Sequence, residues 1–170
     1  MHGMFEEWDM AFARYHVIDD RTAPADAVQL IREAACIFLM GGNATQQFQL
    51  MNEKGIVDAV RRSPAVILGV SAGSINMAKY AVDIWESLMP YGGLGLADIT
   101  VKAHFDLADQ ELVKTLQQVS MQLPVCAMED ESAIFVKGGS STYIGKIHWI
   151  DKGMISPFSQ ELLAKITKEK

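Results

Sequence analysis

Residues 65–77 run Ala65-Val66-Ile67-Leu68-Gly69-Val70-Ser71-Ala72-Gly73-Ser74-Ile75-Asn76-Met77. The first four form a short, continuous apolar run, which is typical of a fully buried strand. From Ser74 to Val82 apolar residues recur at helical spacing, and this predicts a helix. Between the two lies Gly-x-Ser-x-Gly, the pattern of a nucleophile elbow, in which a strand turns sharply into a helix. The same pattern also fits a plain tight turn with a capping serine.

Four residues of this elbow have expected roles. Gly69 and Gly73 carry no side chain that would clash in so tight a turn. Ser71 stands at the tip, beside the positive end of the helix dipole. The backbone N–H of Ala72 would point to where the oxyanion of a tetrahedral intermediate forms. The stretch therefore predicts Ser71 as a nucleophile and Ala72 as an oxyanion donor.

Segments of strand and helix character alternate on both sides of the elbow. The expected strands are 15–18, 36–40, 65–68, 99–101 and 125–128, and the expected helices are 4–14, 24–31, 45–62 with a break near Gly55, 74–82 and 107–121. Such alternation is typical of a parallel sheet with helices on both faces. Strands 133–136 and 143–150, joined by a turn at 138–140, predict antiparallel pairing near the C-terminus. We therefore expect one α/β domain over residues 1–170, with a mostly parallel sheet.

Composition excludes several classes of function. The chain has 170 residues and a net charge of −6. Its basic residues cluster only at Arg61-Arg62 and in the tail with Lys165, Lys168 and Lys170, so nucleic acid is not an expected partner. No apolar run reaches the ~18–20 residues that span a bilayer, and the acidic N-terminus is not a signal peptide. Cys36 and Cys126 lie in apolar, strand-like runs and are expected to be reduced core thiols of a cytoplasmic protein. No cysteine or histidine spacing predicts a metal site.

Polar groups follow several of the expected strands, where the ligands of parallel sheets gather. A serine nucleophile needs an imidazole that takes its proton. Of the four histidines, His2 lies near the terminus, whereas His16 and His148 lie inside strand-like runs, which favours core or surface positions. His104 follows a strand and precedes Phe105, so it is the expected base.

The acid that would orient this imidazole has three candidates, Glu129, Asp130 and Glu131, which follow the strand 125–128. Alternation along an extended chain would aim Asp130 opposite to its neighbours, although a solvated acidic turn is also compatible. Gly42, at the end of another strand, is a candidate second oxyanion donor or a simple turn residue. Asn43 is a candidate substrate ligand or a residue in left-handed conformation.

Five segments in this order resemble the serine peptidase family of dipeptidase E (aspartyl dipeptidase) and cyanophycinase: residues 38–43, 69–74, 93–96, 104–105 and 129–133. The resemblance implies a class I glutamine-amidotransferase-like α/β fold with serine in place of that group's cysteine. It also implies that Ser71 is the nucleophile, His104 the base, and Gly42 and Ala72 the oxyanion donors. The acid best matches Asp130, with Glu129 or Glu131 as alternatives if the register shifts. No metal or organic cofactor is implied.

Two departures from the family pattern bear on function. A strand and a strand–helix unit, together about 30–40 residues, are expected before residues 4–18, so the chain is expected to be shortened at its N-terminus. No arginine follows Arg62, whereas family members acting on aspartyl substrates place arginines after the His-Phe pair, where they clamp a carboxylate. An aspartyl preference is therefore not expected.

The sequence thus predicts a serine peptidase that hydrolyses short peptides through an acyl-enzyme on Ser71. The alternative is a catalytically silent homologue that binds a small ligand or a protein, and acyl transfer or ester hydrolysis at the same site is a third option. A homodimer is a further possibility, because several aromatic residues suit either the core or an interface: Phe5, Trp8, Phe12, Trp85 and Trp149.

Overall fold

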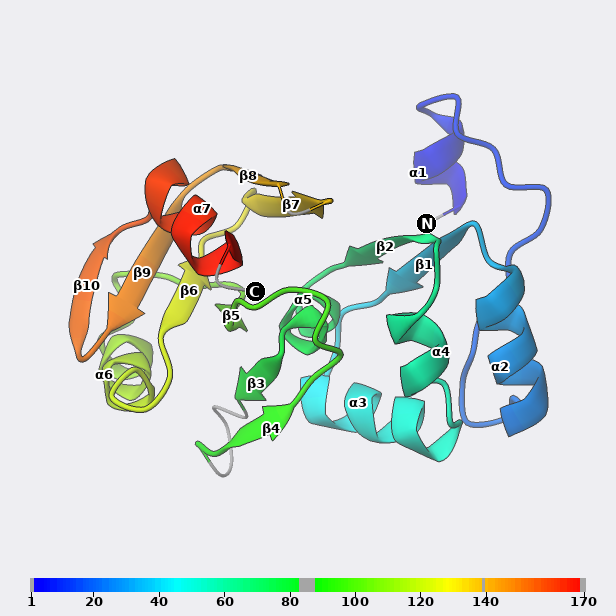
Figure 1. Cartoon of the computed structure of the whole chain (residues 1–170), viewed down its shortest axis with the longest axis horizontal. Helices are drawn as coiled ribbons and strands as arrows, with labels where there is room; N and C mark the ends of the chain where they lie inside the picture. The colour runs from blue at the N-terminus through cyan, green and yellow to red at the C-terminus, as the bar shows by residue number, and fades with distance from the viewer. Residues whose placement is uncertain (1, 83–87, 139, 169–170) are drawn as a thin grey trace.

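The computed structural model describes residues 2–82, 88–138 and 140–168 (Figure 1). In these ranges the helices are α1 (His2–Glu6), α2 (Pro24–Glu33), α3 (Ala44–Glu53), α4 (Val57–Arg61), α5 (Ala72–Met77), α6 (Gln110–Val119) and α7 (Gln160–Lys168). The strands are β1 (Cys36–Leu39), β2 (Val66–Gly69), β3 (Tyr80–Val82), β4 (Pro90–Gly92), β5 (Val101–Lys102), β6 (Val125–Met128), β7 (Ala133–Lys137), β8 (Ser140–Ile144), β9 (Ile147–Asp151) and β10 (Met154–Pro157).

β1 and β2 form a parallel pair in which Leu39 lies opposite Gly69. Alternate residues of β1, Ile37 and Leu39, are buried in a core with residues of α2, α3 and α4, and Figure 1 shows these three helices on one side of the pair. Because the register is parallel, the loops that follow β1 and β2 leave from the same edge. Gly41 and Ser71 are thereby brought close together.

A four-stranded sheet, in the order β10-β9-β6-β5, forms the second half of the molecule. All four residues of β6 are buried, and they alternate between two cores. Val125 and Ala127 pack with residues of α6, whereas Cys126 and Met128 pack with Leu163 of α7. This sheet therefore has a helix on each face, as strand periodicity requires of a strand with no polar face.

The α/β class is confirmed, but the expected mostly parallel sheet is wrong. Among the described strands only β1–β2 and β5–β6 pair in parallel, and these two pairs belong to different sheets. The later strands are joined by short turns, which only antiparallel neighbours allow. For example, Lys152 and Gly153, both with positive φ, connect Asp151 of β9 to its partner Met154 of β10 and so provide the twist that a two-residue hairpin loop needs.

The expected strand over residues 15–18 is absent from the structure. Tyr15 is 72% exposed and Val17 is 67% exposed, and no described strand pairs with this segment. β-branched and aromatic side chains favour a strand only where they pack against a neighbouring strand and a core. The exposed side chains of this segment have no such packing, so their apolar character was not sufficient to form a strand.

Two expected helices end earlier than predicted. α1 ends at Glu6, and Asp9 then adopts a φ of 55° while the N–H of Met10 donates to the carbonyl of Phe5, which is a Schellman ending. α5 ends at Met77. The backbone N–H groups of residues 94–96, in a glycine-rich loop, donate hydrogen bonds to the carbonyls of residues 76–78, so these carbonyls are not available to a further helical turn. The next segment, Tyr80–Val82, is strand β3.

Other local expectations are confirmed. The helix break near Gly55 separates α3 from α4, and the strand 125–128 is β6. The strand expected over 143–150 is divided into β8 and β9 at Gly145, whose φ is 76°. Residues 83–87, with Trp85, and residue 139 lie outside the described residues.

Cys126 is buried and Cys36 is half-buried, and both are free thiols. Burial raises the pKa of each. Trp8 is 78% exposed, whereas Trp149 packs against Phe158. In the part of the chain that the structure describes, no helix is both long enough and apolar enough to cross a bilayer.

Candidate functional site

The predicted elbow lies between β2 and α5. β2 ends at Gly69, α5 begins at Ala72, and Ser71 between them has φ 52° and ψ −113°. A Cβ on Gly69 would lie 2.8 Å from the backbone carbon of Gly73, and one on Gly73 would overlap the carbonyl of Leu39. Both glycines are therefore required by close backbone approach, as the sequence predicted.

The side chain of His104 lies between those of Ser71 and Asp130. Its Nε2 atom is 2.9 Å from Oγ of Ser71, and its Nδ1 atom is 2.7 Å from Oδ1 of Asp130. These are hydrogen-bond distances, and they join a hydroxyl, an imidazole and a carboxylate in the order that serine hydrolases use. The sequence predicts Ser71 and His104 in these roles, and among the three acidic candidates the family resemblance favours Asp130.

The pairing of β5 with β6 brings His104 and Asp130 together. The two strands are parallel, with Lys102 opposite Ala127, so the loops after them leave from one edge. The N–H of Phe105 donates to the carbonyl of Met128 at 2.9 Å, which extends the pairing beyond the strands. His104 follows β5 with a φ of 55°, a conformation that a residue other than glycine keeps only when its surroundings impose it.

Glu129 faces away from this cluster, toward β9. Its Oε1 atom accepts hydrogen bonds from Nε2 of His148 at 2.8 Å and Nζ of Lys146 at 3.0 Å. The hydrogen bond from His148, followed by that from Lys146, holds the pKa of Glu129 below its ordinary value. The ring of His148 also packs edge-on against Phe105, with centroids 5.1 Å apart. Glu129 thus ties β6 to β9 directly behind the loop that carries Asp130.

Glu131, the third acidic candidate, is exposed and has a φ of 61°. Its carbonyl lies against the turn between β8 and β9, where a Cβ on Gly145 would be 2.5 Å from it. The acidic segment is therefore held from two sides, by His148 and by the turn at Gly145. Of its three carboxylates, that of Asp130 is the one hydrogen-bonded to the imidazole of His104 in the described structure.

The glycine loop after β1 passes beside the elbow. A Cβ on Gly41 would lie 3.5 Å from Cβ of Ser71, and Gly42 has a φ of 134°, which favours glycine. Asn43 is extended, with φ −84°, so the left-handed alternative is wrong. Its side chain accepts a hydrogen bond from the N–H of Gln46 and caps α3. That Asn43 also contacts substrate, and that Gly42 is an oxyanion donor, stay predictions.

Lys102 was not singled out from the sequence. It lies on β5 two residues before His104, and its residue is only 9% exposed, with Nζ donating to the carbonyl of Ala103. Burial lowers the pKa of its ammonium, while the nearby carboxylates of Asp109 and Asp130 act in the opposite direction. A lysine inside a two-residue strand leaves no signal in the sequence.

Asn76 was also not singled out from the sequence, where it is one of several polar residues between Ala72 and Val82. The structure buries it completely. A buried amide is costly unless it is hydrogen-bonded, so its burial indicates a hydrogen-bond network.

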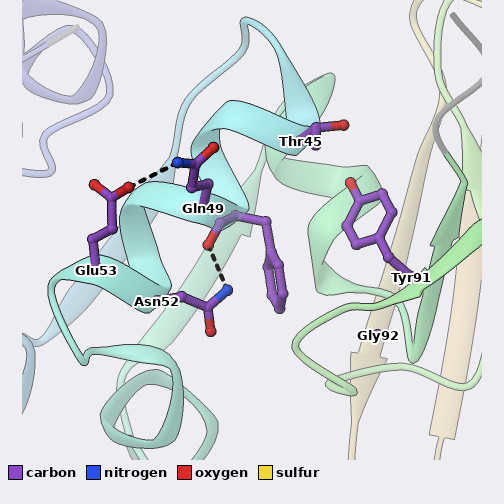
Figure 2. Close-up of a pocket in the computed structure, with 7 residues that line it drawn as sticks. Thr45, Gln49, Asn52, Glu53, Tyr91 and Gly92 are labelled. Carbon is purple, nitrogen blue, oxygen red and sulfur yellow. Dashed lines mark hydrogen bonds between the residues drawn. The ribbon is translucent and has the colours of Figure 1, made fainter. Parts of the chain in front are cut away.

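Two cavities of the described structure lie away from the elbow. One, of about 340 Å³, is lined by residues of α3 and β4, and Figure 2 shows Thr45 on the helix and Tyr91 on the strand. The other, of about 400 Å³, follows the loop of residues 92–96 beside Arg61 and Lys79. Ser71, His104 and Asp130 line neither cavity. Among the described residues, no group of three or more histidine, cysteine, aspartate or glutamate side chains could hold a metal ion.

The model of peptidase family S51 matches residues 1–144 of this chain, which confirms the resemblance to the family of dipeptidase E and cyanophycinase. A peptidase from an acI-B1 Actinobacterium has a similar structure, with a TM-score of 0.59 at 16% identity over 80% of this chain and 64% of that one. A Listeria monocytogenes EGD-e protein, described provisionally as peptidase E, has a TM-score of 0.61 at 18% identity over 72% and 65%.

The chain therefore spans 64% and 65% of the lengths of these two structures. At such identities the similarity concerns the fold. No curated protein matches the sequence.

Proposed function

Since this chain belongs to peptidase family S51, we propose that it is a serine peptidase that hydrolyses short peptides through an acyl-enzyme on Ser71. The observation that carries this proposal is the hydrogen-bonded series of Ser71, His104 and Asp130, with distances of 2.9 and 2.7 Å. Asp130 is the acid in this proposal, because it is the carboxylate that contacts the imidazole.

In the first half-reaction, Oγ of Ser71 attacks the peptide carbonyl while Nε2 of His104 takes the hydroxyl proton. The negative charge moves to the carbonyl oxygen, which the N–H groups of Ala72 and Gly42 stabilise. The carbon–nitrogen bond then breaks as His104 gives its proton to the leaving amine. Asp130 keeps the imidazole oriented and stabilises its charged form.

In the second half-reaction, water attacks the acyl-enzyme and His104 takes a proton from it. The ester bond to Ser71 breaks, Oγ recovers the proton from the imidazolium, and the acid product leaves. Every proton in this cycle passes through one histidine, so the reaction needs no metal or organic cofactor.

The charge of the site favours neutral or basic peptides over acidic ones. The segment that follows His104-Phe105 carries Asp106, Asp109 and Glu111, and no arginine follows Arg62. A substrate carboxylate would therefore meet like charge instead of a guanidinium clamp. We propose that short peptides without an N-terminal aspartate are the substrates.

A panel of dipeptides with acidic, neutral and basic first residues tests this function. We expect release of free amino acids from neutral or basic dipeptides, measured by mass spectrometry, and none by the Ser71→Ala variant. Hydrolysis that persists in Ser71→Ala, or no hydrolysis of any member by the folded wild type, would contradict the proposal.

A second candidate, a catalytically silent binding protein, is favoured by the exposure of the site. The side chain of His104 is 62% exposed and that of Asp130 is 78% exposed, whereas hydrogen bonds and charges act most strongly in sites that exclude water. In that case the dipeptides would bind without being cleaved. Calorimetric titration of the same panel separates binding from turnover.

A further inference from the structure

The side chain of Asn76 joins the elbow helix α5 to α3 and β4. Its Nδ2 atom donates to the carbonyl of Ala44 at 2.8 Å and to Oε1 of Gln47 at 3.0 Å, and both acceptors belong to α3. Its Oδ1 atom accepts a hydrogen bond from the hydroxyl of Tyr91 on β4 at 2.9 Å. Asn76 is fully buried, so these bonds hold α5 rigidly against its neighbours.

Gln47 extends this network to the loop after β1. Its Nε2 atom donates to the carbonyl of Met40 at 2.6 Å while its Oε1 atom accepts from Asn76. Met40 directly precedes Gly41 and Gly42. An unbroken series of hydrogen bonds therefore runs from the elbow helix, through two amide side chains, to the start of the glycine loop.

The other end of the loop, at Asn43 and Ala44, is held by α3 and by Asn76 of α5. Asn43 caps α3 through the N–H of Gln46 at 2.9 Å, and the carbonyl of the next residue, Ala44, accepts from Asn76. Gly41 and Gly42 are exposed, and they lie between Met40 and Asn43, which are both held by hydrogen bonds. Glycine has the largest conformational freedom of all residues. The backbone path of Gly41 and Gly42 is therefore set by the fixed positions of the residues on either side of them.

We propose that Asn76 and Gln47 are positioning residues that set the backbone of Gly42 relative to Ala72, and hence the geometry of the oxyanion hole. This inference rests on the proposed function. The two N–H donors come from different elements, α5 and the loop after β1, and both must face one oxygen atom. Donors displaced by even about 1 Å lose much of their effect on the transition state.

Gln47→Met tests the proposal, because methionine has a similar size and removes both hydrogen bonds of the amide. Gln49→Met is the matched control: Gln49 lies on the same helix, is exposed, and pairs only with Glu53 among the contacts described. The first readout is the rate of covalent labelling by a fluorophosphonate, whose phosphoryl oxygen would occupy the oxyanion hole. The second is kcat and KM on a dipeptide that the wild type cleaves.

We expect Gln47→Met to slow labelling and lower kcat roughly tenfold to a hundredfold, less than the loss of a whole oxyanion donor. KM should stay within about twofold, since the oxyanion exists only in the transition state. The control should match the wild type in both readouts. Unchanged labelling and kcat in Gln47→Met would overturn the inference.

If Gln47→Met does not fold, Gln47→Glu tests the same positioning role. It keeps the length of the side chain and the acceptor for Asn76, but loses the donor to Met40. The same slowing is expected, and wild-type rates would overturn the inference. A wild type that is neither labelled nor active would instead contradict the proposed function, so the two failures are distinguishable.

Discussion

Nε2 of His104 lies 2.9 Å from Oγ of Ser71, although the two residues are 33 positions apart in the chain. Ser71 belongs to the half of the molecule built on β1 and β2, and His104 follows β5 of the four-stranded sheet. The described strands of the two halves do not pair across this junction. The alignment of the imidazole with the hydroxyl therefore depends on the loops that carry the two residues.

Asp130→Asn is expected to lower kcat about 10³–10⁴-fold, because an amide that accepts poorly no longer fixes the tautomer of the imidazole. Glu129→Gln and Glu131→Gln are the matched variants on either side. They should retain kcat within about tenfold, since neither carboxylate contacts His104. Steady-state kinetics of the three variants check this, and a larger loss in Glu131→Gln than in Asp130→Asn would assign the acid differently.

Gly73→Ala is expected to destabilise the fold by about 3 kcal/mol or more, because the added Cβ would overlap the carbonyl of Leu39. Gly92→Ala is the control, since its Cβ would meet nothing within 4 Å. Urea unfolding at pH 7 compares the two. Equal unfolding midpoints for both variants would mean that the elbow does not pack against β1 as the structure shows.

The sequence could predict the elbow and the residues around it because their signals are local. Glycine spacing, an apolar run and helical periodicity each report on a few neighbouring residues. β6 was predicted with correct bounds since four buried apolar residues admit little else. The residues alone leave three candidates for the acid, and the family resemblance favours Asp130. The structure adds that His148 of β9 is hydrogen-bonded to Glu129, a long-range pairing that the acidic segment itself does not indicate.

The remaining errors concern long-range pairing. The strand expected over 15–18 would require a neighbouring strand. The helix expected over 74–82 ends early because the glycine loop of residues 93–96 donates hydrogen bonds to the carbonyls that a further helical turn would use. The mostly parallel sheet was inferred from the order of elements. That order does not determine which strands form hydrogen bonds with each other.

Glu129 is expected to make stability depend on pH. Its pKa is lowered in the folded protein by His148 and then by Lys146, so its contribution is fully present above the ordinary glutamate pKa. The contribution is lost as the pH falls through the lower, folded-state value. The urea midpoint of the wild type should therefore exceed that of Glu129→Gln at pH 7, and the difference should shrink in acid.

Urea unfolding between pH 3 and pH 7 measures this difference. Glu131→Gln is the control, because the neighbouring glutamate has neither the histidine nor the lysine contact in the described structure. Its profile should run parallel to that of the wild type. A difference between Glu129→Gln and the wild type that grew in acid would contradict the assignment.

Lys102→Met is expected to raise the urea midpoint at neutral pH. Burial lowers the pKa of Lys102 in the folded protein, so the charged form costs stability at every pH below that value. The cost disappears as the pH rises through the folded-state pKa toward the ordinary lysine value. The gain from methionine, on the order of 1 kcal/mol, should therefore diminish in base.

Lys114→Met, an exposed position on α6, is the control for Lys102→Met. Its midpoint should stay close to that of the wild type from pH 7 to pH 9.5. A Lys102→Met variant that is less stable than the wild type at pH 7 would mean that the attraction of Asp109 and Asp130 outweighs burial.

The activated serine is tested most directly by intact-mass analysis after treatment with a fluorophosphonate. We expect one adduct on the wild type and none on Ser71→Ala, which loses a single oxygen atom and should keep its fold. A wild type that is folded by circular dichroism yet carries no adduct, or an adduct that persists in Ser71→Ala, would contradict the proposed role of Ser71.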